Sequence, residues 1–158
     1  MTANKIILSI VWVALAALIY YFAESALNPN KVSVLGEDRT VTLARGLDGH
    51  YRAEALINGT KINVLVDTGA TGVAISQQVA DKLGLQSRTA VRTRTANGDT
   101  VAYMTRLESI RIGGVEAKDV SALIAPRLGG DVLLGMSFLG RMDVRLYKGT
   151  MTITQIDG

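Results

Sequence analysis

The chain contains no cysteine and only one histidine, His50. Without thiols it can form no disulfide, no thiol nucleophile and no thiolate metal site. A serine–histidine–aspartate triad would have to use His50, whose Gly-His-Tyr context offers no nucleophile partner. One imidazole cannot form a histidine metal cluster either, so we expect no metal and no cofactor. We interpret His50 as a surface or strand-edge residue.

Neither positive nor negative residues are concentrated in any part of the sequence. The 158 residues include 17 lysines and arginines and 14 aspartates and glutamates, and the basic residues are scattered among the acidic ones. A protein that binds nucleic acid typically shows a concentrated basic stripe. We therefore expect no nucleic-acid partner. The length is sufficient for one domain with a real core and an appendage.

The N-terminus carries the appendage. Residues 6–23 contain no charged side chain, and as a helix they would span about 27 Å, close to the hydrocarbon thickness of a bilayer. Aromatic residues at 20–22 favour the membrane interface, and Lys5 flanks the other end. We interpret residues 1–23 as a single transmembrane anchor. The positive-inside rule then places everything after it outside the cytoplasm.

A cleaved secretory signal is the alternative interpretation. Ala23 and Ser25 could form a small-residue cleavage site, although the length of the apolar run and its bulky aromatic end favour an uncleaved anchor. Both interpretations export the rest of the chain. Residues 24–38 are polar and include a proline and a glycine, which indicates a linker. The folded domain is therefore expected to cover residues 39–158.

The sequence of this domain predicts an all-β fold. Apolar and β-branched residues alternate with a period of two, and Asn58-Gly59 is typical of a hairpin turn. Short helices are expected only at 77–83, capped by Ser76 and ended by Gly84, and at 136–139. The predicted strands are 40–44, 51–57, 61–66, 73–75, 88–96, 99–112, 115–125, 132–134, 142–147 and 151–156.

The candidate catalytic residue is Asp67, which ends the apolar run 64–66. An aspartate in a turn usually bonds only to local backbone amides. Here the aspartate leaves a strand of aliphatic residues, and Gly69 permits a tight turn around it. A faint internal repeat has Leu134-Gly135 at the corresponding place. The domain therefore resembles two related halves with a carboxylate in only one.

Three motifs in series resemble those of a known family. Asp67-Thr68-Gly69-Ala70 resembles the active-site tetrapeptide of retropepsin-like aspartic proteases, "TANG" at 95–98 occurs where that family has its flap hairpin, and "LLGMSFL" at 133–139 resembles its second-half motif. With the anchor, the chain resembles the membrane-anchored retropepsin-like proteases of Gram-negative bacteria. The resemblance implies a closed acid-protease β-barrel with one or two short helices, located in the periplasm and tethered to the inner membrane.

The resemblance also implies an aspartic endopeptidase that works as a homodimer. The family chemistry needs two carboxylates that share one proton and face one water molecule. The sequence has one Asp-Thr-Gly, so Asp67 from each of two protomers would form the pair. Thr68 would link the two active-site loops, and residues 151–156 would pair with their mate in an interface sheet. The substrate would be an extended peptide or protein chain.

Two details of the motifs carry further expectations. Ala96, Asn97 and Gly98 would form the flap over the substrate, although Asn-Gly can equally mark a simple hairpin turn. Ala70 replaces the serine of pepsin-like enzymes, whose hydroxyl favours the ionised carboxylate, so we expect activity in weakly acidic conditions.

Two other functions stay open at the level of sequence. The same fold could be a catalytically silent module for dimerisation or peptide binding. The protease could also face the cytoplasm, because one lysine is the basis for the orientation.

Overall fold

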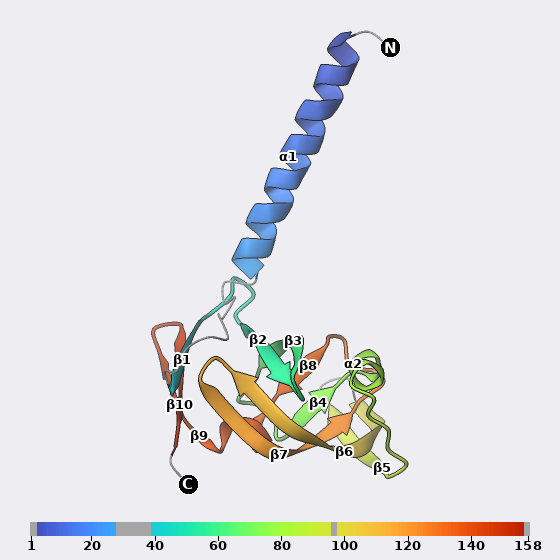
Figure 1. Ribbon diagram of the computed structural model, residues 1–158, viewed down its shortest axis with the longest axis vertical. Helices are drawn as coiled ribbons and strands as arrows, with labels where there is room; N and C mark the ends of the chain where they lie inside the picture. Colours follow the sequence, from blue (N-terminus) through green and yellow to red (C-terminus); the bar gives the residue numbers. More distant parts are fainter. Residues whose placement is uncertain (1–2, 28–38, 96–97, 157–158) are drawn as a thin grey trace.

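A computed structural model describes residues 3–27, 39–95 and 98–156 of the chain. Its N-terminal element is a single straight helix, α1 (Ala3–Leu27), which stands away from the β domain in Figure 1. The segment Lys5–Glu24 is long and apolar enough to cross a membrane, and none of it is buried. Trp12 is 64% exposed on this helix. The helix continues to Leu27, so the first residues of the expected linker are helical; the rest, 28–38, lie outside the described residues.

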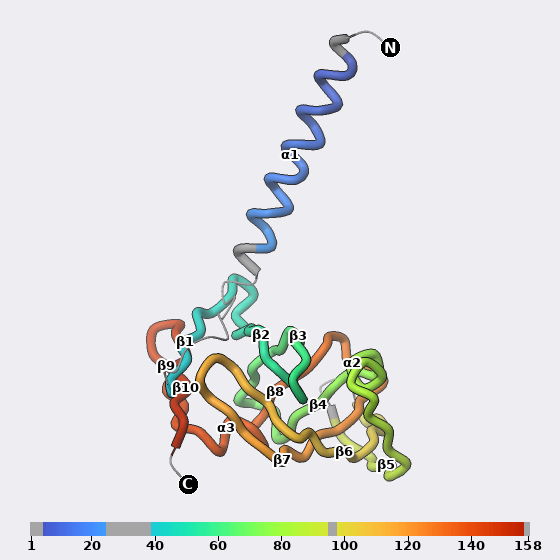
Figure 2. The backbone as a smooth tube through the Cα atoms, viewed as in Figure 1, coloured from blue at the N-terminus to red at the C-terminus, as the bar shows by residue number. Residues whose placement is uncertain are grey.

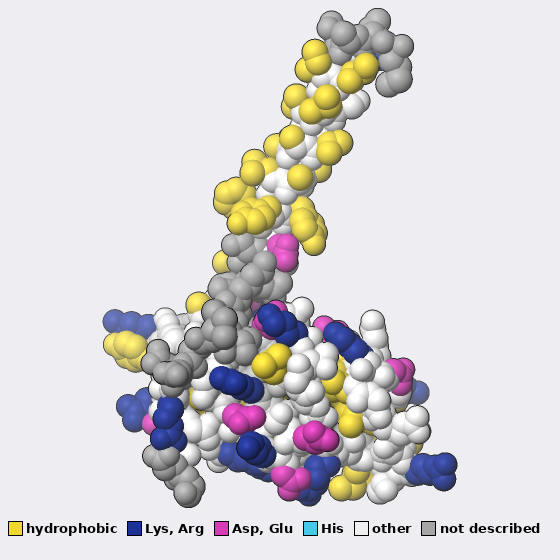
Figure 3. Space-filling view, in the orientation of Figure 1, with side chains coloured by type: hydrophobic (Ala, Val, Ile, Leu, Met, Phe, Trp, Pro, Cys, Tyr) yellow, Lys and Arg dark blue, Asp and Glu magenta, His cyan; other side chains and the backbone are white. Residues whose placement is uncertain are grey.

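The surface of the helix differs in kind from that of the β domain. Figure 3 shows hydrophobic side chains along the visible face of the coloured part of α1, whereas basic and acidic side chains are interspersed over the visible face of the domain. This mixture fits the scattered charges of the sequence. Apolar residues of the domain are mostly buried, and its core is one contiguous cluster that includes Leu43, Leu107 and Phe138.

In the described residues the domain comprises strands and two short helices, arranged as predicted to within two residues at each end. The strands pack around a compact centre in Figures 1 and 2. In chain order the elements are β1 (Thr40–Ala44), β2 (Tyr51–Ile57), β3 (Thr60–Val66), β4 (Val73–Ile75), α2 (Gln77–Lys82), β5 (Ala90–Thr95), β6 (Gly98–Ile112), β7 (Val115–Ile124), β8 (Val132–Leu134), α3 (Met136–Leu139), β9 (Met142–Tyr147) and β10 (Thr150–Gln155).

Six of these strands close into a barrel, which confirms the predicted fold. The larger sheet has the order β2-β3-β8-β4-β7-β6-β5, and β2 pairs again with β6 through Leu56 opposite Arg111 and Ile57 opposite Ile110. This second pairing joins the two ends of the six-stranded part, and β5 extends β6 outside the barrel. Closure removes the open strand edges that an unclosed sheet would present.

Local sequence explains the first hairpin and the first short helix. Asn58 and Gly59 have φ values of 48° and 77°, the left-handed conformations that a tight two-residue hairpin turn requires. Ser76 caps α2 by accepting a hydrogen bond from the Val79 N–H, and Gly84 follows the helix with a φ of 66°.

A separate three-stranded sheet has the order β1-β10-β9. The central strand, β10, pairs along its length with β1 on one side (Thr40 opposite Thr154) and with β9 on the other (Gln155 opposite Met142). Both edges of β10 are therefore hydrogen-bonded within one chain. Within this single chain neither edge of β10 is free, so direct pairing of residues 151–156 with their mate would need one of these neighbours to be displaced, and it stays a prediction.

Candidate active site

Asp67 lies directly after β3, beside the end of β8. The two strands are parallel, with Leu65 opposite Leu133 and Val66 opposite Leu134, and the Asp67 N–H donates to the Leu134 carbonyl oxygen at 3.0 Å. Val66 and Leu134 are buried in the barrel. Since side chains alternate along a strand, Asp67 shares the outer face with Leu65. The barrel therefore fixes where the carboxylate leaves the sheet.

The turn after Asp67 holds its carboxylate. The Gly69 N–H donates to Asp67 Oδ1 at 2.8 Å, and the Ala70 N–H donates to the Asp67 carbonyl oxygen at 3.3 Å. A side chain at position 69 would place its Cβ 3.2 Å from Oδ1, so glycine leaves room for this bond. Asp67 is half-buried, and Thr68 and Gly69 are exposed. One carboxylate oxygen is thus oriented by the backbone at an accessible turn.

The start of α3 binds the far side of the same loop. The Met136 and Ser137 N–H groups donate to the carbonyl oxygens of Ala70 and Thr71 at 2.8 and 3.0 Å. In return, Ser137 Oγ accepts the Val73 N–H at 3.0 Å. These contacts connect residues 70–73 to the second half of the domain. They make Ser137 a positioning residue that sequence reasoning noticed only as part of a motif.

Gly135 permits this approach. A Cβ at this position would lie 2.4 Å from the carbonyl oxygens of both Ala70 and Gly72, which is far inside van der Waals contact. The second-half glycine of the "LLGMSFL" motif is therefore explained by the loop after Asp67, which packs on it.

Two other predicted site features have different outcomes. The Thr68 hydroxyl has no hydrogen-bond partner within the part of the chain that the structure describes, so it is available to a group from outside. Of the expected flap, Ala96 and Asn97 lie outside the described residues. Gly98 begins β6 with a φ of 101° and pairs with Thr95. The flanking strands therefore form the predicted hairpin, and the role of its tip stays a prediction.

A cavity of about 400 Å³ lies on the face of the sheet to which Asp67 belongs. Leu65 and Leu133 contribute to it from adjacent strands, and Leu128 adds a third apolar side chain. Its lining residues are Arg52, Asn63, Val64, Leu65, Leu128, Gly129, Gly130, Asp131, Val132 and Leu133. We refer to this space as the leucine cavity.

A second cavity of about 480 Å³ lies between the β5–β6 hairpin and the segment that follows β7. Its lining residues are Arg92, Asp99, Thr100, Val101, Tyr103, Pro126 and Arg127. We refer to it as the arginine cavity. Sequence reasoning did not identify either cavity, since each is formed by segments that are distant in the chain.

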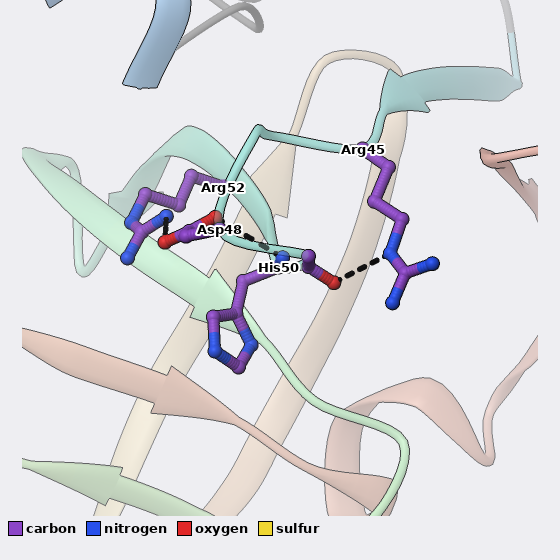
Figure 4. A network of polar contacts seen from close by, with 5 residues as sticks. Arg45, Asp48, His50 and Arg52 are labelled. Atoms are coloured by element: carbon purple, nitrogen blue, oxygen red, sulfur yellow. Dashed lines mark hydrogen bonds and ion pairs between the residues drawn. The ribbon is translucent and has the colours of Figure 1, made fainter.

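The loop before β2 connects the leucine cavity to a polar network, drawn in Figure 4. Arg52 donates to an Asp48 carboxylate oxygen, and the His50 N–H donates to the other oxygen at 3.1 Å. The Arg52 hydrogen bond, followed by that of His50, holds the pKa of the Asp48 carboxyl below its usual value. Arg45 Nε closes the loop with a 2.7 Å bond to the Gly49 carbonyl oxygen. His50 is exposed beside β2, as predicted.

Metal-binding side chains do not gather in this part of the molecule. Among the described residues, no three histidine, cysteine, aspartate or glutamate side chains are placed to hold one ion.

Comparison with known proteins places these features in a family. Residues 53–141 match the model of the gag-polyprotein putative aspartyl protease family. The crystal structure of a retropepsin-like aspartic protease from Rickettsia conorii is 33% identical, with a TM-score of 0.66 over 73% of this chain and 90% of that chain. EIAV protease, complexed with the inhibitor HBY-793, shares the fold with a TM-score of 0.51 at 24% identity, over 60% of this chain and 88% of that chain.

A relative of greater length matches as well. An uncharacterized protein from the cobV 5′ region of a Sinorhizobium species is 32% identical over 127 residues, which is 76% of this chain and 54% of that protein. The chain thus spans about half the length of that relative. The family model covers more than half of the present chain, including Asp67, Gly135 and Ser137. The chain therefore belongs to the retropepsin-like aspartic proteases of the gag-polyprotein putative aspartyl protease family.

Proposed function

We propose that the protein is an aspartic endopeptidase whose catalytic pair consists of Asp67 from each of two protomers. The main support is the Asp67 carboxylate, which the Gly69 N–H orients at an exposed turn. The sequence has a single Asp-Thr-Gly, so the second carboxylate would have to come from another protomer. The Thr68 hydroxyl is exposed and has no hydrogen-bond partner among the described residues, which supports a second protomer on this turn.

In the proposed mechanism the two Asp67 carboxyls share one proton because two adjacent carboxylates resist simultaneous ionisation. The ionised member removes a proton from a water molecule, which attacks the scissile carbonyl carbon. The protonated member donates its proton to the carbonyl oxygen. The Gly69 N–H keeps one oxygen of each carboxylate in place during both transfers. Ala70 supplies no side-chain hydroxyl to this pair, which supports activity in weakly acidic conditions.

The leucine cavity supports a peptide substrate with an apolar side chain near the scissile bond. Leu65 lies two residues before Asp67 on the same face, and Leu133 and Leu128 extend the apolar lining. A second protomer would supply an equivalent cavity on the other side of the shared axis. An extended peptide would then be held between two related half-sites.

The anchor and the location belong to the same proposal. Helix α1 would hold the protein in the inner membrane, the segment up to residue 38 would be a linker, and residues 39–158 would form the protease domain in the periplasm. Confinement to a membrane raises the effective concentration of protomers and so favours dimers. A reporter fused after residue 158 that is active only outside the cytoplasm tests this orientation, since a silent reporter would place the domain in the cytoplasm.

The test of catalysis compares the full-length protein with its Asp67→Asn variant in detergent micelles. The amide can still accept the Gly69 N–H but cannot act as a base, so we expect cleavage of a quenched-fluorescent unfolded protein to fall about 10²–10⁴-fold, or to background. Cleavage is followed from acidic to neutral pH, with and without a transition-state peptide inhibitor.

The control is Asp143→Asn, which alters a carboxylate on β9 that binds Arg145. This variant should cleave like the wild type, and circular dichroism should show that both variants are folded. Cleavage retained by a folded Asp67→Asn protein would eliminate the mechanism. A wild-type protein that binds peptides and never cleaves them would favour the catalytically silent alternative.

A further inference from the structure

The arginine cavity has a basic lining. Arg92 contributes from β5, and Arg127 contributes from the segment that follows β7. Among the described lining residues, Asp99 is the only one with a carboxylate. Two arginines from different elements therefore line the same cavity.

The single carboxylate does not neutralise those two groups. Asp99 is bound by Arg94, whose Nε lies 3.3 Å from Asp99 Oδ1. Within the described ranges of the chain, neither Arg92 nor Arg127 has an ion-pair partner. The leucine cavity differs in this respect, because its one arginine, Arg52, is bound by Asp48.

The chain connects the arginine cavity to the candidate active site. Arg127 is followed directly by Leu128, and residues 128–133 line the leucine cavity. Leu133 in turn pairs with Leu65, two residues before Asp67. One loop, residues 126–133, therefore contributes to both cavities.

The chemistry of the lining selects the occupant. A guanidinium group is planar, always charged, and matched to a carboxylate through two parallel hydrogen bonds. Within a peptide, the side chains that carry a carboxylate are those of aspartate and glutamate. Tyr103 and Val101 provide apolar surface on which the methylene groups of such a side chain can pack.

We propose that the arginine cavity is a subsite for an acidic side chain of the peptide substrate, with Arg92 and Arg127 as the residues that determine this specificity. The proposal rests on the proposed function for the identity of the ligand as a peptide. The substrate would then need an acidic side chain at some distance from the scissile bond, in addition to the apolar side chain near that bond.

The test measures binding by full-length Asp67→Asn protein in detergent micelles, so that no peptide is consumed. The probes are fluorescent peptides that differ only in a glutamate or a glutamine, moved through successive positions, and the readout is fluorescence anisotropy. At one position we expect glutamate to bind about tenfold more tightly than glutamine, as is usual for a charge-assisted pair. Raising the salt concentration should reduce this ratio.

The same peptides are then tested on Arg92→Glu and Arg127→Glu proteins. Each substitution should abolish or invert the preference for glutamate while glutamine peptides bind as before. If the reversed charge prevents folding, the neutral variants Arg92→Gln and Arg127→Gln are tested in place of the glutamate variants. Arg145→Glu is the matched control, since Arg145 lies on β9 and binds Asp143; it should keep the preference.

Two results would overturn the proposal: equal binding of glutamate and glutamine peptides at every position, or a preference that survives both arginine substitutions. Failure of the proposed function gives a different pattern. If the wild type cleaves nothing but the arginine-dependent preference is present, the subsite stands without the protease. If the wild type cleaves peptides with no such preference, only the subsite is lost.

Discussion

Among the glycines near the candidate site, Gly135 leaves the least room for a side chain. Two carbonyl oxygens of the Asp67 loop lie where a side chain would begin, both 2.4 Å from an added Cβ. The φ of Gly135 is −100°, so alanine is not excluded by its backbone conformation. The cost of a substitution is therefore purely steric, and the loop or α3 would have to move.

We predict that Gly135→Ala lowers the free energy of unfolding by about 1–3 kcal/mol or more, the range for overpacked interiors. The measurement is urea unfolding of the full-length protein in detergent, followed by circular dichroism. Gly130→Ala is the control, because nothing lies within 4 Å of a Cβ at that position. Equal stability of the two variants would show that Gly135 is not packed against the loop as described.

At this scale the sequence indicated the candidate catalytic residue but not its environment. Asp67 and Gly69 are adjacent in the chain, so their contact could be inferred from the motif. The contacts of Ser137 and Gly135 with the same loop cross more than sixty residues, and only the folded barrel brings them together. Arg92 and Arg127 gave no signal at all, because isolated arginines are common on any surface.

The elements of the fold were predictable for local reasons. Asn58-Gly59 and the alternation of apolar residues defined the hairpins, and Ser76 defined the start of α2. What local patterns could not predict was pairing between distant strands. Closure of the barrel depends on β2 and β6, and the central place of β10 depends on β1, which lies at the other end of the domain.

The turn before β2 allows a prediction about one titrating group. Arg52 stabilises the ionised Asp48 carboxyl, so its folded-state pKa is lower than its unfolded value. The bond therefore contributes to stability above the unfolded pKa, and this contribution is lost as the pH falls through the folded pKa. Arg52→Gln should raise the pKa of Asp48 toward its ordinary value. Carboxyl NMR titration measures this change, and Arg145→Gln, which breaks an ion pair on β9, should leave it unaltered.

At the scale of the whole molecule, the proposed dyad means that a dimer is active only when both of its protomers carry an intact Asp67. If wild-type and Asp67→Asn chains are folded together in equal amounts and assemble at random, about one quarter of the dimers contain two intact carboxylates. Total activity should then be about one quarter of that of the same amount of wild-type protein, whereas independent protomers would give about one half. Retention of half the activity after complete exchange of protomers would exclude a shared site.

The arrangement of the small sheet limits how such a pair can form. Since β10 is enclosed by β1 and β9, a second protomer has to approach through the outer edge of one of those strands or through side-chain contacts alone. The exposed Leu146 and Tyr147 at the end of β9 are apolar groups that such contacts could cover.

The position of Trp12 has an optical consequence for every solution study of this protein. It is the only tryptophan of the chain, and it lies on α1 with 64% of its surface exposed. Its emission wavelength will follow the polarity of whatever surrounds the helix, whether detergent, lipid or water. The β domain has no such fluorophore, so unfolding of the barrel has to be followed by circular dichroism or by tyrosine emission, to which Tyr20 and Tyr21 of α1 also contribute. The tryptophan signal thus reports on the helix alone, whatever happens to the domain.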